Sequence, residues 1–391
     1  MIIENNIDNV DYNYIFPENT AENKDYLTSQ LIAYFGNKRK FLPLIEEAIL
    51  KVSKKLNKKR MKTLDGFSGS GVISRLLKKH SELIYTCDQE NYASVISECY
   101  LSNHSQVDKK ELLEYIELLN HRFETNYYPP GFIEELYAPK DDNDIQPNER
   151  VFFTNYNAKR LDSFRQGIND IPEDKQKYLY GPLFNKMSKN VNTVGHFTAF
   201  LKNKNTGIGK FGGTYANNSI LNRILKPIIL ELPILSNFES EFVVYKDNIN
   251  SVIKNIHELD FAYFDPPYTV GKYSKQYFMF NLFLDYKRPD KITNIVGAPI
   301  VESNSSSYNN KKTALESINQ LINDTNSPYI LLSYSSGGLI ELNDMIDTLK
   351  KYGKLEKIDI NYKKYKTKRY KDKIMDSILD VTEYLFFLEK N

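Results

Sequence analysis

The sequence predicts an α/β fold, a doubly wound and mostly parallel sheet with an inserted subdomain. A strand, a glycine turn, a helix and a second strand follow one another between residues 62 and 88, and this βαβ order is typical of parallel sheets with helices on both faces. Successive strands of such sheets usually lie about 30 residues apart, but about 200 residues separate this turn from the strand that ends in FDPPY. An inserted unit explains that gap.

Local patterns predict the individual elements. Between residues 39 and 56 the apolar residues recur every three or four positions, which predicts a helix packed by one face. The segment KTLDGF predicts a strand that ends at Asp65, and ELIYTCD predicts a strand that ends at Asp88. Later strands are expected at LDFAYF, YILLSYS and YLFFLE.

The turn signals also suggest the domain organisation. YYPPGF, DDNDIQPNE and GKFGG punctuate the stretch between the two groups of strands. We therefore expect an N-terminal extension over residues 1–27, an α/β domain made of residues 28–104 and 241–391, and an inserted domain over residues 105–240.

Composition narrows the class of protein. The 391 residues are 41% hydrophobic, enough to bury a large core. No apolar stretch approaches the ~20 residues needed to span a bilayer, and the N-terminus lacks the features of a signal peptide, so we expect an intracellular protein without a membrane partner. The two cysteines, Cys87 and Cys99, are too few for a disulfide framework. The five histidines lack ligand spacing, and we expect no metal.

Two basic segments stand out from a net charge of only +2. Residues 186–226 contain seven Lys or Arg and no acid, and YKKYKTKRYKDK at 362–373 contains seven Lys or Arg and one acid, with tyrosines interleaved. Either segment alone could be a solvated surface. Together with the stretch FDPPY, whose residues could hold the amino group of a flat heterocycle, they favour a polyanionic partner.

A glycine turn, DGFSGSG at 65–71, follows the first strand. Glycines there let a ligand approach the backbone, and the next helix offers free N–H groups to an anion. The pattern is neither G-x-G-x-x-G nor the Walker motif. Asp88 closes the next strand, where an acid can hold both hydroxyls of a ribose. It could equally cap the helix that follows.

The stretch FDPPY places Asp265 directly after buried strand residues. The carboxyl edge of a parallel sheet is where such folds hold their active sites. Pro266 and Pro267 stiffen the loop and leave the backbone carbonyls free. A carboxylate, a carbonyl and the ring of Tyr268 grouped so tightly could hold the amino group of a flat heterocycle. A rigid turn with a capping acid is the alternative.

Four motifs in this order resemble the Dam-like adenine-specific DNA methyltransferases: LIAYFGNKRKFLPLI, LDGFSGSG, CDQENYASVI and FDPPY. The resemblance runs over roughly residues 28 to 390 and also includes FFTNYNAKRLDSFR and ILLSYSS. It implies a Rossmann-like methyltransferase fold, S-adenosyl-L-methionine as cofactor, and transfer of a methyl group to the 6-amino group of an adenine flipped out of double-stranded DNA.

The resemblance also assigns site residues. Asp265, Pro266 and Tyr268 would hold the target adenine. Lys38 would lie near the methionine carboxylate, and Asp88 would bind the ribose. The full set expected around the cofactor is Tyr34, Gly36, Lys38, Asp65, Phe67, Gly69, Ser70, Asp88 and Asp265.

The chain departs from the family pattern twice. Asp247-Asn248 stands where many relatives carry an aromatic residue against the cofactor adenine, and Tyr277-Phe278 replaces a frequent Tyr-His. The family's aromatic contact with the cofactor adenine is therefore not assigned at Asn248, and any role of the family's histidine is absent.

The inserted domain would recognise DNA. Its lysines would contact phosphates, while Asn190, Asn192 and Thr193 would contact base edges. The residues expected on DNA are Lys186, Lys189, Asn190, Asn192, Thr193, Lys202, Lys204, Lys210, Lys364, Lys368 and Arg369. We also expect a monomer in the cytoplasm of a bacterium or a phage-infected cell, associated with the nucleoid, and a cognate restriction endonuclease as a candidate partner.

Several other functions are less consistent with the residues at these positions. Methylation of the exocyclic amine of cytosine usually uses Ser where Asp265 stands. Enzymes acting on RNA or on protein glutamine usually present Asn there and have a shorter insertion. A DNA-binding protein with a relict methyltransferase fold is disfavoured by the presence of Asp265, Tyr268 and Asp88.

Overall fold

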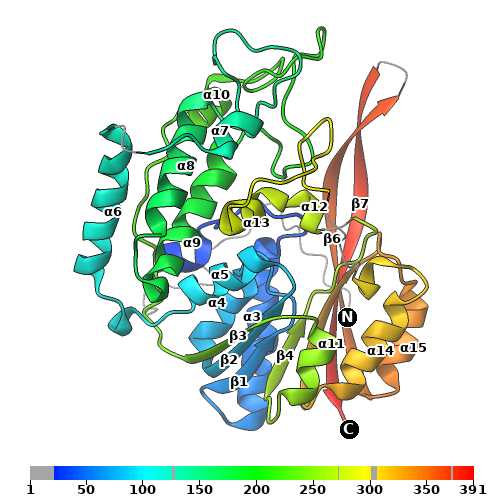
Figure 1. Cartoon of the computed structure of the whole chain (residues 1–391). Helices are drawn as coiled ribbons and strands as arrows, with labels where there is room; N and C mark the ends of the chain where they lie inside the picture. Colours follow the sequence, from blue (N-terminus) through cyan, green and yellow to red (C-terminus); the bar gives the residue numbers. More distant parts are fainter. Residues whose placement is uncertain (1–21, 126–127, 272, 301–305, 371–372) are drawn as a thin grey trace.

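The computed structural model describes residues 22–125, 128–271, 273–300, 306–370 and 373–391, without the side chains of 362–381. Within them, seven strands form one sheet in the order β3-β2-β1-β4-β5-β7-β6 (Figure 1). Their bounds are β1 Met61–Asp65, β2 Ser81–Asp88, β3 Glu241–Lys246, β4 Phe261–Phe264, β5 Tyr329–Ser335, β6 Gly353–Tyr370 and β7 Lys373–Lys390.

The first five strands in chain order run parallel, and β7 runs antiparallel to both of its neighbours. The ends of β1, β2 and β4 lie side by side, because Asp65 pairs with Thr86 on one side and with Tyr263 on the other. Strand order reverses at β1 and β4, and ligands bind doubly wound sheets at such a switch point. The predicted doubly wound fold is confirmed.

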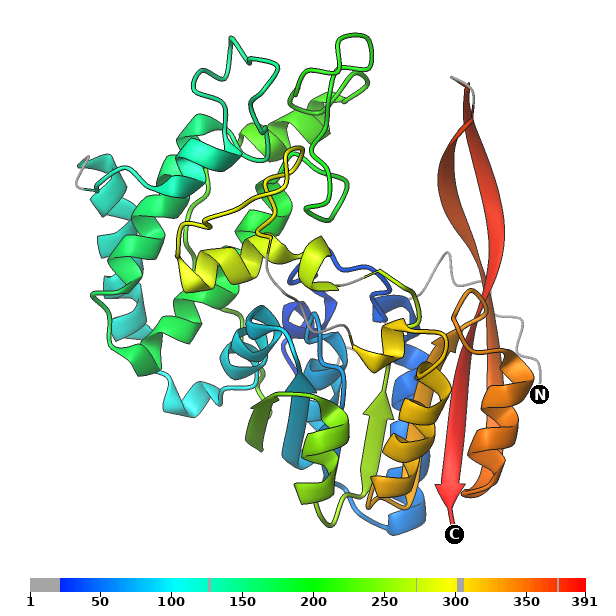
Figure 2. The ribbon, with the colours of Figure 1, turned by 45° about the vertical axis from the view of Figure 1, so that its right-hand side comes forward.

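Helices cover both faces of the sheet (Figure 2). Side chains alternate along β5, so that Leu331 joins the apolar cluster under one set of helices while Ile330 and Leu332 join the cluster under the other. The first face carries α3 (Leu42–Leu56), α4 (Val72–His80) and α5 (Asn91–Tyr100), and the second carries α11 (Ile249–Val252), α14 (Ala314–Asp324) and α15 (Leu342–Lys350).

The predicted strand ends at Asp65 and Asp88 are confirmed, and the helix expected over 39–56 forms as a 3-10 turn, η2 (Arg39–Phe41), that continues into α3. The three later strands also form. Strand β3 was not predicted, because its side chains are half-buried or exposed and therefore lack a continuous apolar run. The long β6–β7 pairing was likewise not predicted.

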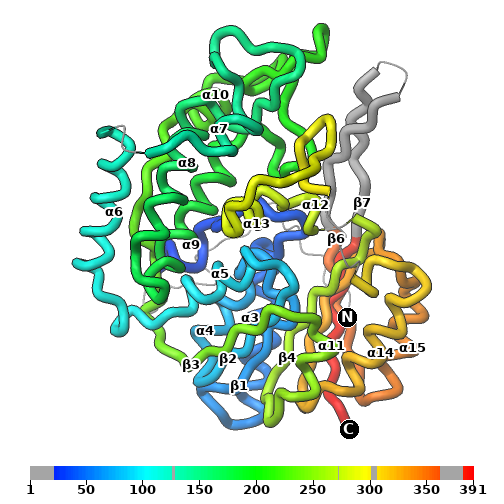
Figure 3. Tube along the Cα trace, viewed as in Figure 1, coloured from blue at the N-terminus to red at the C-terminus, as the bar shows by residue number. Residues whose placement is uncertain are grey.

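Residues 105–240, which follow α5 and precede β3, build a helical unit beside the carboxyl edge of the sheet (Figures 1 and 3). Helix α13 lies after β4 in the chain but packs with this unit, since Arg165 donates to the carbonyls of Phe283 and Leu284. The helices are α6 Lys109–Glu124, α7 Phe132–Tyr137, α8 Asn155–Ile168, α9 Glu173–Asn190, α10 Asn218–Leu225, α12 Tyr273–Gln276 and α13 Phe278–Asp285.

The remaining short elements are α2 Lys24–Thr28, η3 His104–Gln106, η4 Ile253–Asn255 and η5 Ser307–Asn309. Helix α2 is anchored by Arg75, whose guanidinium donates to the carbonyls of Tyr26 and Ser29. In the described part of the chain, each helix is too short or too polar to cross a membrane.

Candidate active site

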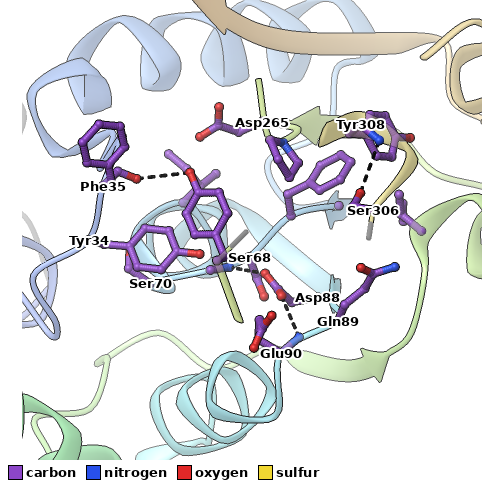
Figure 4. Close-up of a pocket in the computed structure, with 18 of the residues that line it drawn as sticks. Tyr34, Phe35, Ser68, Ser70, Asp88, Gln89, Glu90, Asp265, Ser306 and Tyr308 are labelled. Carbon is purple, nitrogen blue, oxygen red and sulfur yellow. Dashed lines mark hydrogen bonds between the residues drawn. The ribbon is translucent and has the colours of Figure 1, made fainter. Parts of the chain in front are cut away.

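A pocket opens at the carboxyl ends of β1, β2 and β4, with residues 34–38 along one wall. Figure 4 shows Asp265 on one side of it, and Asp88 with Glu90 on the opposite side. Of the residues predicted around a cofactor, eight line this pocket: Tyr34, Gly36, Lys38, Phe67, Gly69, Ser70, Asp88 and Asp265.

The glycine turn is shaped by close contacts. Gly69 has a φ of +45°, and a Cβ there would come within 2.9 Å of the Tyr34 ring. A residue with a side chain would strain the backbone and displace that ring. Glycine at this position therefore lets the turn pack closely against Tyr34 where both line the pocket.

Asp88 is tied to the turn. Its Oδ2 accepts a hydrogen bond of 2.8 Å from the Gly69 amide, and its Oδ1 accepts one of 2.9 Å from the Glu90 amide. Burial raises the pKa of Asp88, while these amides oppose the rise. The helix that follows begins at Asn91 with Glu90 as its N-cap, so Asp88 fixes the chain before the helix and is not the cap itself.

Asp65 is the one predicted cofactor residue outside the pocket lining. Its side chain is buried, and its Oδ2 accepts a hydrogen bond of 2.6 Å from the Ser74 hydroxyl in α4. Burial raises the pKa of Asp65 to about 7. The predicted contact with a cofactor is not supported, because this side chain points into the interior between β1 and α4.

Aromatic rings hold the segment 34–38 in place. Tyr34 stacks on Tyr277 and Tyr273, with ring centroids 4.8 and 5.2 Å away. The Phe35 amide donates to the Tyr277 hydroxyl at 2.7 Å, and a Cβ on Gly36 would lie 3.0 Å from the Tyr268 hydroxyl. Segments far apart in the sequence thus form one wall.

Lys38 lies between two carboxylates. Its Nζ is 3.0 Å from Asp265 Oδ1 and 2.9 Å from Glu383 Oε1, and its side chain is only 3% exposed. Burial opposes its charge, but the two acids raise the pKa of Lys38 well above its ordinary value. Its predicted role beside a methionine carboxylate stays a prediction.

Asp265 keeps one oxygen available. Oδ1 is buried beside Lys38, whereas the side chain as a whole is 20% exposed. Among the described residues, Oδ2 has no hydrogen-bond partner, and Asp265 lines the pocket. Burial raises the pKa of Asp265 to about 6, and Lys38 opposes that rise.

The other two residues predicted to hold the target base do not line this pocket. Pro266 and Tyr268 are not among the lining residues, and Tyr268 is 8% exposed with its ring edge-on to Tyr334 at 5.9 Å. The Tyr268 carbonyl accepts a hydrogen bond of 3.1 Å from the Leu339 amide. These contacts anchor Tyr268 in the loop, and the contacts of the loop with a base stay a prediction.

Three predicted base-reading residues are buried. Asn190 donates to the Lys226 carbonyl. Asn192 donates to the carbonyls of Val151 and Lys210, and its side-chain oxygen accepts from the Gly212 amide. The Thr193 hydroxyl accepts from the Gly195 amide. These side chains hold loops of the helical unit. The prediction that they face DNA is wrong for this conformation, because burial removes them from any base edge.

The lysines predicted to contact DNA differ in solvent exposure and in ion pairing. Lys202, Lys204 and Lys210 are exposed, as is Lys189. Lys186 is paired with Glu231 at 2.7 Å. The side chains of Lys364, Lys368 and Arg369 lie outside the described residues, so their predicted role is untested.

Sequence reasoning missed three side chains of the site. Glu383 comes from β7 and Tyr308 from η5, and Asn281 of α13 donates to the pocket carboxylate of Glu90 at 2.6 Å. None of them lies beside a motif. Their positions follow from contacts between distant segments, for which one sequence carries no local signal.

Fold and pocket together define a class: α/β enzymes in which a glycine turn and an acidic strand end meet at the switch point of a doubly wound sheet. The comparison of the sequence with protein families is more specific. The chain belongs to the D12 class N6 adenine-specific DNA methyltransferase family, whose model matches residues 34–348. The predicted family and adenine-specific methylation of DNA are thereby confirmed, and the enzyme requires a methyl donor.

Individual proteins similar to this chain are also named as methyltransferases. The chain is 28% identical to the Type II methyltransferase M.NlaIII of Neisseria lactamica, over 91% of this chain and 99% of that protein. It is 29% identical to the Type II methyltransferase M.CviAII of Paramecium bursaria Chlorella virus 1, over 91% and 98%. The Type II methyltransferase M.FokI of Planomicrobium okeanokoites is 27% identical over 84% of this chain, but the match covers only 48% of that longer protein.

Proposed function

We propose that this enzyme transfers a methyl group from S-adenosylmethionine, bound in the pocket, to the 6-amino group of an adenine held at Asp265. The observation that carries the proposal is the position of Asp265. Its carboxylate faces the same pocket that the glycine turn and Asp88 line from the other side (Figure 4). A donor and an acceptor bound to these two sides would meet.

The residues present suit S-adenosylmethionine. The pocket combines carboxylates for ribose hydroxyls and an ammonium group, a glycine turn that admits close approach, and the half-buried ring of Phe67 for a purine. Phe67 makes an edge contact with Tyr308 at 5.2 Å. The Asn248 side chain instead accepts from the Asn250 amide as the N-cap of α11, so Phe67 is the better candidate for the adenine contact.

Asp265 would activate the target amine. The nitrogen lone pair of adenine is delocalised into the ring, which makes the amine a poor nucleophile. Hydrogen bonds from its two N–H groups to Asp265 Oδ2 and the Pro266 carbonyl would favour a tetrahedral nitrogen and orient its lone pair. When bound, S-adenosylmethionine would supply an electrophilic methyl group by breaking its S–C bond, so that a neutral thioether leaves. A direct in-line displacement would need no protein nucleophile, and the methylated nitrogen would then lose one N–H proton to solvent.

The cysteines fit that mechanism. Cys87 and Cys99 are both buried, and burial raises the pKa of each thiol far above its ordinary value. A thiol in this state is a poor nucleophile.

DNA would lie across the carboxyl edge of the sheet, between the sheet and the helical unit. The target base must leave the duplex to reach Asp265. We propose that the helical unit, formed by residues 105–240 together with α13, is the recognition domain. Its exposed Lys202, Lys204 and Lys210 are suited to phosphate contacts.

The relatives suggest the biological setting. Because the similar proteins M.NlaIII and M.CviAII are named Type II methyltransferases, we propose that this enzyme modifies one specific DNA sequence as the monomeric partner of a restriction endonuclease. Methylation-sensitive long-read sequencing of DNA from expressing cells should return N6-methyladenine in one sequence context. Methylated cytosine, or methylation of RNA alone, would contradict the proposal.

A further inference from the structure

A buried cluster of three charged side chains adjoins the pocket. Lys38 comes from the segment before η2, Asp265 from the end of β4, and Glu383 from β7. The Lys38 ammonium is 3.0 Å from Asp265 and 2.9 Å from Glu383. With one positive and two negative charges, the cluster carries a net negative charge.

Glu383 is the most deeply buried of the three. Its side chain is 1% exposed, and its Oε1 also accepts a hydrogen bond of 3.0 Å from the Ser333 hydroxyl. It stands opposite Ser335 in the β5–β7 ladder and opposite Ile360 in the β6–β7 ladder, so the backbone on both sides fixes its position. Burying a second carboxylate is costly, and a neutral side chain would pack in the same place at lower cost.

The second carboxylate changes what Lys38 does to Asp265. If the Lys38 ammonium were paired with Asp265 alone, it would offset the negative charge of the Asp265 carboxylate and weaken the hydrogen bonds that this carboxylate accepts from other donors. Here the ammonium is held at nearly equal distances from two acids. Its pull on Asp265 is therefore divided, and Asp265 retains more negative charge for a hydrogen bond at Oδ2.

We propose that Glu383 is a positioning residue for methyl transfer, which holds Lys38 between two carboxylates so that Asp265 stays oriented and strongly basic toward the target amine. The inference rests on the proposed role of Asp265. It assigns to β7, a strand outside the four motifs, a direct influence on the acceptor side of the site.

The pH dependence of the reaction reports this influence. Glu383 raises the pKa of Asp265, and Lys38 lowers it. Replacing Glu383 by a neutral residue should thus lower that pKa and move the acid limb of the rate profile to lower pH. Among the described residues, the charged or titratable groups that face Asp265 or Lys38 are Asp65 from β1, Tyr263 from β4, Tyr268 from the following loop, Tyr273 from α12 and Glu383 from β7.

The test is a single-turnover rate of DNA methylation measured from about pH 5 to about pH 8. Glu383→Gln should lower the plateau rate about tenfold, as expected when one acceptor is weakened, and should shift the acid limb to lower pH. Affinities for DNA and for S-adenosylmethionine should stay near those of the wild type. The matched control is Glu389→Gln on the same strand, which removes a half-exposed ion pair with Lys55 and should change neither rate nor profile.

Two outcomes with the Glu383→Gln variant overturn the inference. One is a wild-type rate and profile in Glu383→Gln. The other is a slower rate with an unmoved acid limb, which a merely structural role would produce. If thermal unfolding shows that Glu383→Gln does not fold, Glu383→Asp is the second variant. It keeps the negative charge but moves it away from Lys38 by one methylene, and the acid limb of its rate profile should shift to lower pH by a smaller amount. An unmoved limb in that variant also overturns the inference.

Failure of the proposed function gives a different result. Asp265→Ala with a rate within about tenfold of wild type would remove Asp265 from the reaction altogether. An inactive Asp265→Ala beside a wild-type Glu383→Gln would leave the proposed function standing and reject only the role of Glu383.

Discussion

The Gly69 amide donates a hydrogen bond of 2.8 Å to Asp88 Oδ2, which joins the glycine turn after β1 to the end of β2. One wall of the pocket is thus built from two strand ends that hold each other. Ribose hydroxyls that bind Asp88 would meet a carboxylate already oriented by the Gly69 and Glu90 amides.

Asp88→Ala should therefore weaken S-adenosylmethionine binding about tenfold or more, because a charged acceptor of two hydroxyls is lost. Calorimetry measures the affinity directly. Glu82→Ala, at an exposed position of the same strand, is the matched control and should bind normally. An unchanged affinity in Asp88→Ala would restrict this carboxylate to holding the backbone.

Asp265→Ala should abolish methyl transfer while S-adenosylmethionine binding largely survives, since the proposed hydrogen bonds act on the target amine. We expect a rate loss of about a hundredfold or more, comparable to the removal of one preorganised group from a transition state. Filter-based methylation assays give the rate, and calorimetry gives cofactor affinity. Equal losses in both would place Asp265 on the cofactor instead.

The methylation rate should fall as the pH drops through about 6. Burial raises the pKa of Asp265 to about 6, so the carboxylate is ionised above that pH and able to accept from the amine, and it is protonated below. Single-turnover rates across this range provide the measurement. A rate that stays constant to about pH 4, near the pKa of an ordinary aspartate, would contradict the assigned role.

Asp65→Asn should stabilise the protein in alkaline solution. Burial raises the pKa of Asp65 to about 7 in the folded state, against about 4 when unfolded. At a pH between about 4 and about 7, folding therefore takes up a proton at Asp65. The free energy that the protonated Asp65 contributes to folding is fully present below about pH 4 and is lost as the pH rises through about 7. The Tm of Asp65→Asn should exceed that of wild type at pH 8 and approach it at pH 5. An equal Tm difference at both would exclude a shifted Asp65.

Replacing Lys202, Lys204 and Lys210 together by alanine should weaken binding to all duplexes alike. Each lost phosphate contact should flatten the log–log salt dependence of binding by about 0.9. Salt titrations on cognate and scrambled DNA test this. The control triple Lys54, Lys59 and Lys350 is exposed near the opposite edge of the sheet, where β1 and β6 begin, and its replacement should leave the slope unchanged. If both triples behave alike, the lysines of the helical unit lie away from DNA.

The sequence by itself determined three strand ends of the sheet and the positions of the motifs. Apolar runs that stop at Asp65, at Asp88 and before Asp265 predict three strand ends, and parallel strands bring their carboxyl ends to one edge. Local periodicity was sufficient there, because strand formation and burial of these segments follow from neighbouring residues. The pocket that joins the glycine turn to the DPPY loop was therefore predictable.

Only the tertiary structure decided which polar side chains reach that pocket. Asn192 and Asp65 resemble ligand contacts in sequence but are buried against backbone carbonyls or a serine hydroxyl. Glu383 has no motif around it, yet β7 inserts between β5 and β6 and brings it to Lys38. Residue type fixes what a side chain can donate or accept, whereas its burial and its partner depend on which segments pack against it. For Lys38 and Glu383 those segments lie hundreds of residues apart in the sequence, so their contact forms only when the whole chain packs.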